Sequence, residues 1–440
     1  MSWPEDYAVR TFRPEEIAGA SLSASVPGSK SITNRALLTA ALAEGKSTLR
    51  GVLFSEDSRD LIRCLDDLSV PMEVCEAGRE VRVTGSGGRI PVKNARVNVG
   101  SAGTAARFLA AAFGLSDGVY RMDSSEQMKR RPMEPLIAAL RDVGAGIRCL
   151  DQEGHFPMEI AGNGGKPFAC TVNIDQSSQF LSALLIAAGA GGNEAVITAE
   201  GTHGTGYIRM TTALMRQFGA EVSHEGRVYR IPAGTHYTGR DFAVEPDVSA
   251  ACYFYAAAAV LGIAVTVPGV HSKSLQGDLR FLNILEEMGC TVTDTAEGIR
   301  VLGPAGGHLH GITADFSAFS DQSMTLAAIA PFTDSPVEIT DIGHIRLQES
   351  DRLHGMAAEL ARLGIRCEEL ADSLKIWPGA PQPAQVQTYG DHRMAMSFAL
   401  TGLRAPGIVI TDPLCCRKTF EDYFTELDRF CGALEAEQKA

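Results

Sequence analysis

Cationic side chains recur through this 440-residue chain at equivalent places in a repeated pattern. A cation precedes each of six amphipathic stretches, and successive members lie roughly 70 residues apart, which indicates one structural unit used repeatedly. These cations are Arg59, Arg131, Arg209, Arg280, Arg352 and Lys418. Because the planar guanidinium of arginine binds carboxylate and phosphate groups through paired hydrogen bonds, such positions suit the binding of anions.

A second series of polar residues opens Ala-rich apolar stretches at nearly the same interval. Its members are Ser29, Ser101, Ser177, Ser249, Ser320 and Asp391. A helix that begins at such a residue presents free N–H groups and roughly half a positive charge at its N-terminus. Several such N-termini at equivalent ends of repeated units predict a binding site for phosphate or carboxylate.

Each of these positions, taken alone, has an ordinary structural explanation. A serine or aspartate before a helix is commonly an N-cap, and a single arginine in a loop is commonly solvated surface. The whole set is harder to explain in that way, because the chain is acidic, with a formal net charge of −13. The cations concerned are Lys30, Arg35, Arg107, Arg131, Arg352, Arg393 and Lys418. We therefore expect the protein to bind two or more anionic groups.

The elements that position these residues follow a fixed order. Apolar residues at helical spacing end in an apolar-x-x-apolar-small pattern, whose last residues are Ser69, Gly144, Gly219, Gly289, Gly364 and Cys431. A short hairpin pattern follows most of these helices, and uncharged stretches such as residues 182–188 predict buried helices. The sequence thus predicts an α/β protein with mixed sheets, built from six strand–helix–strand–helix–hairpin units.

Six buried helices cannot share a single core in a chain of this length, which suggests two or three domains, and we expect a split into two domains of three units each. The first lobe is expected to cover residues 26–245. The second is expected to combine residues 1–25 with residues 246–440, and the chain is expected to cross near residues 242–247.

Composition excludes several classes of function. The negative net charge argues against a nucleic-acid binder. The apolar run 250–267 is long enough to suggest a membrane span, but it contains Gly262 and stops at Pro268. We expect a buried helix followed by a strand there, and no membrane partner.

Redox state and metal binding can also be judged from the sequence. The ten cysteines lack metal-ligand spacing, and Met1–Asp6 lacks a signal-peptide pattern, so we expect reduced thiols and a cytoplasmic location. His308 and His310 stand beside a glycine turn, but two histidines alone make a weak case for a metal. We expect no metal site and no cofactor.

Seven segments at the polar loops resemble those of a known family. They are residues 26–38 (VPGSKSITNRALL), 102–107 (AGTAAR), 131–132 (RP), 177–179 (SSQ), 349–352 (ESDR), 389–396 (YGDHRMAM), and 412–413 (DP) with 418–420 (KTF). They match, in order and over almost the whole chain, motifs of the 5-enolpyruvylshikimate-3-phosphate synthases of the enolpyruvyl transferase family. The resemblance implies a two-lobed inside-out α/β barrel with three units per lobe.

The resemblance also implies a reaction and its ligands. The enolpyruvyl group of phosphoenolpyruvate would pass to the 5-hydroxyl of shikimate 3-phosphate, and phosphate would be released. By motif match, the residues implied for shikimate 3-phosphate are Lys30, Ser31, Arg35, Ser177, Ser178, Gln179, Asp321 and, at an altered position, Gln348. Those implied for phosphoenolpyruvate are Lys30, Gly103, Arg131, Gln179, Arg352, Arg393 and Lys418.

These residue types fit the chemistry. The attacking hydroxyl needs a base, for which we choose Asp321, and C3 of phosphoenolpyruvate needs an acid, for which Glu349 or Lys30 could serve. Gly103 has no side chain and lets backbone approach a small ligand closely. By resemblance, Gly103 also implies inhibition by glyphosate.

The chain departs from the family pattern at several positions, among them residues 204–207, which lack a serine that some members use on the phosphate. Gln348 replaces a usual lysine, His344 a common asparagine and Ser101 a usual asparagine, while Phe108 stands where some members have proline. Gln348 removes a cation that would touch the shikimate hydroxyls. Phe108 leaves the degree of glyphosate sensitivity open.

Two alternatives remain at this point. One is the sibling enzyme that uses UDP-N-acetylglucosamine, although it typically has Lys-Asn at the first loop, where this chain has Lys30 and Ser31. The other is a non-catalytic anion-binding scaffold, which Gln348 alone favours. For the active enzyme we expect a monomer.

Overall fold

The computed structural model describes residues 5–438, which divide into two compact units. One unit comprises Gly28–Glu245, and the other combines Met1–Pro27 with Pro246–Ala440. Residues 1–4, part of the N-terminal segment without a signal-peptide pattern, and residues 439–440 lie outside the described residues. The resemblance implies that the first lobe binds shikimate 3-phosphate and the second lobe binds the carboxylate of phosphoenolpyruvate, and this stays a prediction.

The described strands of Gly28–Glu245 form three four-stranded sheets. In strand order these are β14 (Asp241–Ala243), β3 (Glu44–Arg50), β5 (Glu80–Ser86) and β4 (Met72–Cys75); β6 (Asn94–Asn98), β7 (Val119–Asp123), β9 (Met158–Ala161) and β8 (Gly146–Cys149); and β10 (Phe168–Asn173), β11 (Ala195–Glu200), β13 (Val228–Ile231) and β12 (Ser223–Glu225). In each sheet the first two strands are parallel and the remaining pairs antiparallel. A helical crossover followed by a hairpin produces this mixed pattern.

Within the described part of the other unit there are two four-stranded sheets and one three-stranded sheet. They are β2 (Ser21–Ser23), β15 (Ala264–Pro268), β17 (Gly298–Leu302) and β16 (Thr291–Asp294); β18 (Thr313–Asp315), β19 (Val337–Thr340), β21 (Leu374–Ile376) and β20 (Cys367–Glu369); and β22 (Ala384–Val386), β23 (Ile408–Thr411) and β1 (Asp6–Ala8). The six repeated units expected from the sequence, three per lobe, are confirmed.

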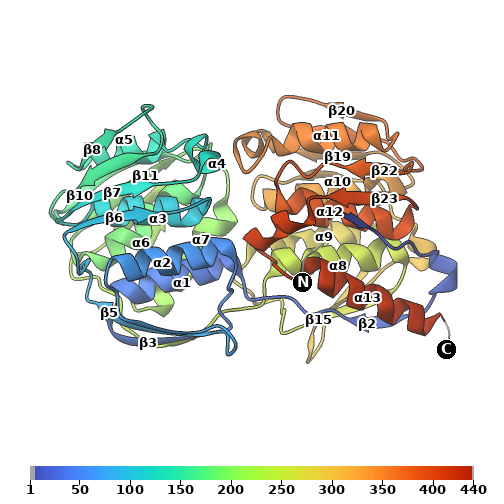
Figure 1. Ribbon diagram of the computed structural model, residues 1–440, viewed down its shortest axis with the longest axis horizontal. Helices are drawn as coiled ribbons and strands as arrows, with labels where there is room; N and C mark the ends of the chain where they lie inside the picture. Colours follow the sequence, from blue (N-terminus) through green and yellow to red (C-terminus); the bar gives the residue numbers. More distant parts are fainter. Residues whose placement is uncertain (1–4, 439–440) are drawn as a thin grey trace. The chain divides into compact units, whose positions relative to one another are not determined.

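One helix of each repeat is buried along nearly its whole length. These are α1 (Lys30–Leu42), α3 (Gly103–Gly114) and α6 (Gln179–Ala190) in one unit, and α8 (Val248–Leu261), α10 (Ser323–Ile329) and α12 (His392–Arg404) in the other. In α8 every residue except Ser249 is buried, because the helix carries only small and apolar side chains elsewhere. Within each unit the three buried helices pack on one another (Figure 1).

The second helix of each repeat is amphipathic. These helices are α2 (Glu56–Asp67), α5 (Glu134–Asp142), α7 (Thr205–Gln217), α9 (Arg280–Glu287), α11 (Arg352–Arg362) and α13 (Tyr423–Glu437), and a short α4 (Glu126–Lys129) precedes α5. Five of the repeated small residues adopt the left-handed conformation that ends a helix, namely Ser69, Gly144, Gly219, Gly289 and Gly364. The sixth expectation is wrong: Cys431 lies inside α13, which continues to Glu437 because nothing there terminates it.

Strand pairing shows where the repeats exchange parts along the chain. β14 comes last in its unit but pairs with β3 of the first repeat, and β2 precedes α1 in sequence but pairs with β15. β1 pairs antiparallel with β23, in the place that a hairpin strand takes in the other repeats. Strands from the two ends of Gly28–Glu245 therefore share one sheet, and the N-terminal strands β1 and β2 complete two sheets of the other unit.

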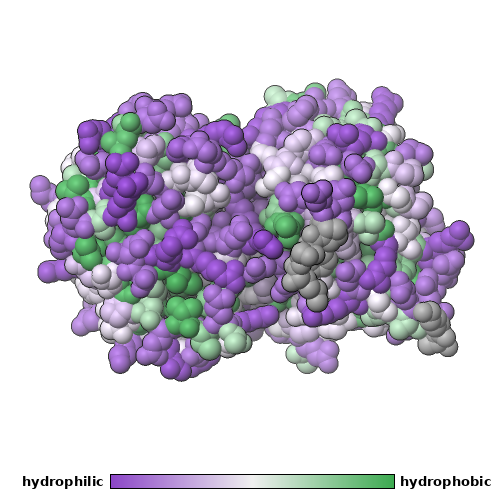
Figure 2. Space-filling model, in the orientation of Figure 1, coloured by the Kyte–Doolittle hydropathy of each residue, from purple (hydrophilic) through white to green (hydrophobic). Residues whose placement is uncertain are grey.

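The long apolar run of the sequence has the structure expected for it. Residues 248–261 form the buried helix α8 and residues 264–268 the strand β15, with Gly262 in the left-handed conformation between them. Among residues 5–438, no helix combines the length and the apolar character that crossing a bilayer requires. Figure 2 shows a face on which hydrophilic residues predominate and apolar ones are scattered.

Candidate active site

The N-terminus of α1 carries the first group of expected site residues. The Ser29 hydroxyl caps the helix by accepting a hydrogen bond from the Ile32 N–H, at 3.5 Å. Lys30 is the first helical residue, and its Nζ lies 3.4 Å from Oδ2 of the nearly buried Asp57. The carboxylate of Asp57 therefore holds the Lys30 ammonium at the helix mouth.

Arg35 lies one turn further along α1 and is 2 % exposed. Its guanidinium donates to the Thr211 hydroxyl at 2.7 Å and to the Ser31 carbonyl at 2.9 Å, and it stands 5.3 Å over the Phe108 ring. Among residues 5–438 no carboxylate lies within ion-pair distance of it. Burial lowers the pKa of Arg35 to about 10. A buried cation held only by neutral groups favours an anion as its partner.

Two further arginines meet at the N-terminus of α3. A Cβ added to Gly103 would lie 2.5 Å from Nη1 of Arg131 and 2.6 Å from Nη1 of Arg107. Arg107 also donates to the Gly103 carbonyl and to Oε1 of Gln179, both at 3.1 Å. The two guanidiniums thus flank a helix N-terminus whose first residue has no side chain, as a small anion requires.

The loop before α6 completes this group. The Ser177 hydroxyl accepts a hydrogen bond from the Gln179 N–H at 3.3 Å, and the nearly buried Ser178 packs against Gly204. Gly204 has a φ of 68° and begins α7, so the chain turns there in a conformation that favours glycine. α6 is linked to α3 through Gln179 and to α1 through Ser182, whose hydroxyl lies 3.5 Å from Arg35.

The second group of site residues lies in the other unit and centres on Asp321. This residue occupies the turn η4 (Ser320–Gln322) before α10. Its Oδ1 accepts from Arg352 at 3.2 Å and its Oδ2 from Arg393 at 2.7 Å. The two arginines thus each donate a hydrogen bond to one carboxylate, and the same arrangement would suit the carboxylate of a ligand.

Arg352 begins α11 and connects most of the second group. Its Nε and Nη2 bind the buried Asp391 at 2.8 and 3.2 Å, Nη2 lies 2.9 Å from Glu349, and Nη1 also donates to Gln348. Burial disfavours the charged guanidinium, but attraction to Asp391, Glu349 and Asp321 outweighs burial and raises the pKa of Arg352. Arg352 is therefore charged at every working pH.

Lys418 and Asp391 close this cluster. Nζ of Lys418, at the end of η7 (Pro413–Lys418), lies 3.4 Å from Glu349. Asp391 caps α12 by accepting from the Arg393 N–H at 3.0 Å and also accepts from the Ser350 hydroxyl at 3.0 Å. Three cations and three carboxylates, Asp321, Glu349 and Asp391, are thus held together.

The structure therefore places the expected residues in two sets, one in each unit. We call them the arginine–serine set (Lys30, Ser31, Arg35, Gly103, Arg131, Ser177, Ser178 and Gln179) and the Asp321 set (Asp321, Gln348, Glu349, Arg352, Arg393 and Lys418). Sequence reasoning did not assign a role to Asp57 or Asp391 as partners of these cations. Asp391 belongs to the repeated series of polar residues, which could have pointed to it, whereas no repeat or motif marks Asp57.

Three of the repeated cations do not join either set. Arg59 pairs with Glu76 at 3.0 Å with its side chain 38 % exposed, and Arg209 and Arg280 are exposed. None of these three cations is among the site residues expected from the sequence. The position recurs because the fold recurs.

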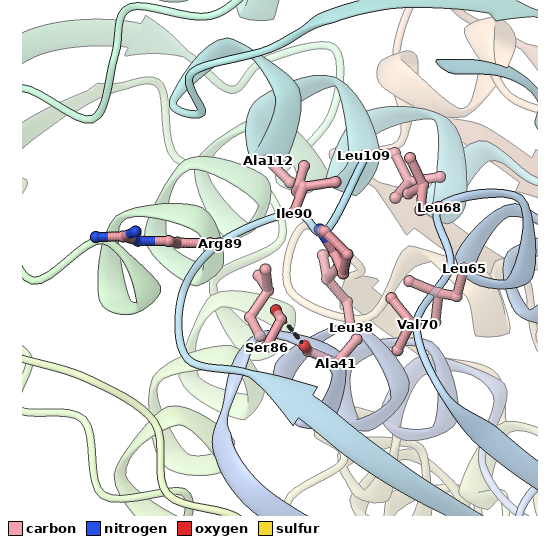
Figure 3. A pocket seen from close by; sticks show the side chains of 12 residues that line it. Leu38, Ala41, Leu65, Leu68, Val70, Ser86, Arg89, Ile90, Leu109 and Ala112 are labelled. Atoms are coloured by element: carbon pink, nitrogen blue, oxygen red, sulfur yellow. Dashed lines mark hydrogen bonds between the residues drawn. The ribbon is translucent and has the colours of Figure 1, made fainter. Parts of the chain in front are cut away.

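His308 and His310, considered above as metal ligands, are both exposed. His310 pairs with the exposed Asp334 at 2.7 Å, and within the described residues no three His, Cys, Asp or Glu side chains gather as a metal site requires. The pocket in Figure 3 lies among α1, α2 and α3, is lined by alkyl groups such as Leu38, Leu65 and Leu109, and Arg89 points away from it. Such a lining does not suit an anionic ligand.

Comparison with known proteins gives the same family throughout the chain. The sequence profile of EPSP synthase (3-phosphoshikimate 1-carboxyvinyltransferase) matches residues 17–427. The 3-phosphoshikimate 1-carboxyvinyltransferase of Trichormus variabilis is 46% identical over 411 residues, covering 92% of this chain and 96% of that protein. That of Nostoc punctiforme is 45% identical over 412 residues, covering 93% and 96%.

Solved structures agree with the sequence relatives. EPSP synthase from Acinetobacter baumannii has a TM-score of 0.78 at 26% identity, covering 96% of this chain and 98% of that one. An enolpyruvyl transferase from Streptomyces tendae has a TM-score of 0.73 at 17% identity, covering 96% of both chains, and shows the shared fold. With its motifs, its six repeats and close relatives along nearly its whole length, the chain belongs to the EPSP synthase (3-phosphoshikimate 1-carboxyvinyltransferase) family.

Proposed function

We propose that the arginine–serine set and the Asp321 set together carry out the reaction of this family. Phosphoenolpyruvate and shikimate 3-phosphate give the 5-enolpyruvyl ether and phosphate. The 5-hydroxyl adds to C2 while C3 gains a proton, which gives a tetrahedral ketal. The C2–O bond to phosphate then breaks as C3 loses a proton, so that the double bond returns and no redox step is needed.

We assign shikimate 3-phosphate chiefly to the arginine–serine set. Arg35 is supported as a phosphate ligand because it is a buried cation held by neutral groups. Ser177 and Ser178 add hydroxyl donors before α6, Gln179 is the first residue of α6, and Lys30 and Ser31 are the first residues of α1. Asp321 and Gln348 would contact the ring hydroxyls.

We assign phosphoenolpyruvate to cations of both sets. These are Lys30, Arg131, Arg352, Arg393 and Lys418, together with Gly103 and Gln179. Arg352 and Arg393 already hold the Asp321 carboxylate, which supports them as ligands of the substrate carboxylate. When the substrate carboxylate takes the place of the Asp321 carboxylate on these two arginines, Asp321 gives up two charge-assisted hydrogen bonds and gains proton affinity.

The proton transfers follow from this exchange. Asp321, once released, would take the proton of the 5-hydroxyl. Glu349, between Arg352 and Lys418, or Lys30, beside Asp57, would supply the proton to C3. One positioned proton transfer is typically worth about 10²–10⁴-fold in rate.

The observation that carries this proposal furthest is the pair of guanidiniums around Gly103. Arg107 and Arg131 converge on a helix N-terminus where any side chain would collide with them. Backbone N–H groups and two cations therefore point at one small space, which suits a compact anion such as phosphoenolpyruvate.

Gly103→Ala is expected to raise KM for phosphoenolpyruvate by about 10-fold or more, which is a loss of roughly 1.4 kcal/mol. The added methyl would push both guanidiniums from the anion site. KM for shikimate 3-phosphate should change little. Steady-state kinetics with Gly432→Ala as control would test this, because Gly432 is helical and has open space around it. Equal effects in the two variants would refute the proposed anion site at Gly103.

Arg131→Ala is expected to weaken phosphoenolpyruvate far more than shikimate 3-phosphate. A charge-assisted hydrogen bond from a buried arginine typically contributes ~1.5–3 kcal/mol, or at least about 10-fold in affinity. Dissociation constants for each substrate, measured by calorimetry on the variant and the parent, would decide this. Equal loss of both affinities would contradict the assignment of Arg131.

Binding alone can separate an active enzyme from an anion-binding scaffold. Shikimate 3-phosphate is expected to bind without phosphoenolpyruvate present and to lower the dissociation constant of phosphoenolpyruvate. UDP-N-acetylglucosamine should do neither. A scaffold would bind each anion independently. Calorimetric titrations in both orders measure the coupling, which must be equal in the two directions.

We also propose three finer properties. Glyphosate, which carries a carboxylate and a phosphonate, would compete for the cations that we assign to phosphoenolpyruvate. The protein would act as a monomer, which is supported by both sets coming from a single chain. A cytoplasmic location is supported by ten cysteines that are all free thiols.

A further inference from the structure

A buried carboxylate outside both sets lies behind Asp321. Asp278, on the turn η2 (Gly277–Leu279), is 2 % exposed. Its Oδ1 accepts two hydrogen bonds, from the Ser249 hydroxyl and from Nε2 of Gln322, both at 2.9 Å. No cation lies within ion-pair distance of it among residues 5–438. A buried carboxylate without a counter-ion lowers the stability of the folded protein, so its presence calls for an explanation.

The bond to Gln322 reaches the residue next to Asp321. Gln322 is fully buried and ends η4, the turn that carries Asp321. Its amide is fixed at both ends, because Nε2 donates to Asp278 and Oε1 accepts from the Thr325 hydroxyl at 3.0 Å. The position of η4 therefore depends on the acceptor that Asp278 provides.

The bond to Ser249 extends this link to Arg393. Ser249 lies on α8 one turn before Tyr253, whose hydroxyl accepts from Nη1 of Arg393 at 3.4 Å. Nη2 of Arg393 in turn holds Asp321. These contacts form a closed ring that runs through Asp278, Gln322, Asp321, Arg393 and α8, so that a shift of one member moves the others.

The members of this ring also shift the pKa of the Asp278 carboxyl. Burial and, to a smaller extent, Asp321 raise the pKa of Asp278 to about 6, against the opposing effects of Arg393, Gln322 and Ser249. The buried thiol of Cys252 donates to the Asp278 carbonyl at 3.8 Å, and burial, Asp278 and Asp247 all raise the pKa of that thiol. Asp278 and Asp321 therefore influence one another electrostatically as well as through Gln322.

We propose that Asp278 is a positioning residue for the reaction: through Gln322 and Ser249 it fixes the turn that carries the Asp321 carboxylate. This inference rests on the proposed role of Asp321 as the base. Asp278 touches no reacting atom and acts only through the placement of Asp321. A displacement of about 1 Å at a reacting group can lower a rate on the order of 10²-fold.

The matched variants are Asp278→Ala and Asp278→Asn. Alanine removes the acceptor, whereas asparagine keeps an oxygen that can accept both hydrogen bonds. Asp278→Ala is expected to lower kcat about 10- to 100-fold, and Asp278→Asn less than about 3-fold. An alanine variant with normal kcat and only a lower Tm would overturn the proposal, as would equal losses in both variants.

A double-mutant cycle separates positioning from general damage. In an Asp321→Asn background, Asp278→Ala should lower kcat less than about 2-fold further, because Asp278 acts only through Asp321. A full further loss would show a merely structural role and overturn the proposal. Ser249→Ala, a milder change on α8, serves in the same cycle if the alanine at 278 does not fold. If Asp321→Asn alone has normal kcat, the proposed base is wrong; if it is slow while Asp278→Ala is normal, only the positioning role fails.

Discussion

Asp321→Asn is expected to lower kcat at least about 100-fold while leaving the affinity for both substrates within about 3-fold. Asparagine has the size of aspartate and still offers an oxygen to Arg352 or Arg393. It cannot take a proton from the 5-hydroxyl. The loss should therefore fall on the chemical step and not on binding.

Single-turnover kinetics and equilibrium titration on the same preparation would measure the two effects of Asp321→Asn separately. Asp315→Asn is a suitable control, because Asp315 ends β18 in the same unit, is exposed, and only caps its own turn through the Ser317 N–H. If Asp321→Asn turns over at close to the normal rate, the base must be sought elsewhere in the two sets.

Arg352→Ala is expected to have the largest effect, lowering kcat/KM for phosphoenolpyruvate about 1,000-fold. It removes a proposed ligand of the substrate carboxylate and leaves Asp391, Glu349 and Asp321 facing one another. Breaking a buried ion pair on one side typically costs ~3–5 kcal/mol. The thermal midpoint should therefore fall together with the activity.

Arg59→Ala provides the matched control, because Arg59 holds the corresponding position of the first repeat but pairs with Glu76 at the surface. Exposed pairs of this kind contribute ~0–1 kcal/mol, so kinetics and melting should barely change. Arg352→Lys should restore part of the stability but little of the affinity, since one ammonium cannot bridge three carboxylates. A variant of Arg352 that loses stability but keeps its KM for phosphoenolpyruvate would remove this residue from the donor site.

The fold could be predicted from the sequence because each repeat carries local patterns that mark its helices and their ends. Glycines such as Gly144 and Gly289 mark helix ends by their conformation, and the uncharged α8 could only be buried. The sequence analysis placed residues 1–25 with the second lobe, but it did not predict the strands with which β1, β2 and β14 pair, since strand partners far apart in sequence leave no local signal.

The candidate site was predictable only where a motif or a repeat marked it. Arg131 and Arg352 occupy the same repeated position as Arg59, and only burial and partners in three dimensions distinguish them. Asp57 and Asp278 lie on elements that carry no recognised motif. Their roles depend on which cation or amide faces them, and the fold alone decides that.

The most direct measurement is release of phosphate by the purified protein supplied with shikimate 3-phosphate and phosphoenolpyruvate, without added metal. We predict that phosphate appears only when both substrates are present, with one phosphate for each enol ester consumed. Release without shikimate 3-phosphate, or no release with both substrates present, would contradict the proposed function.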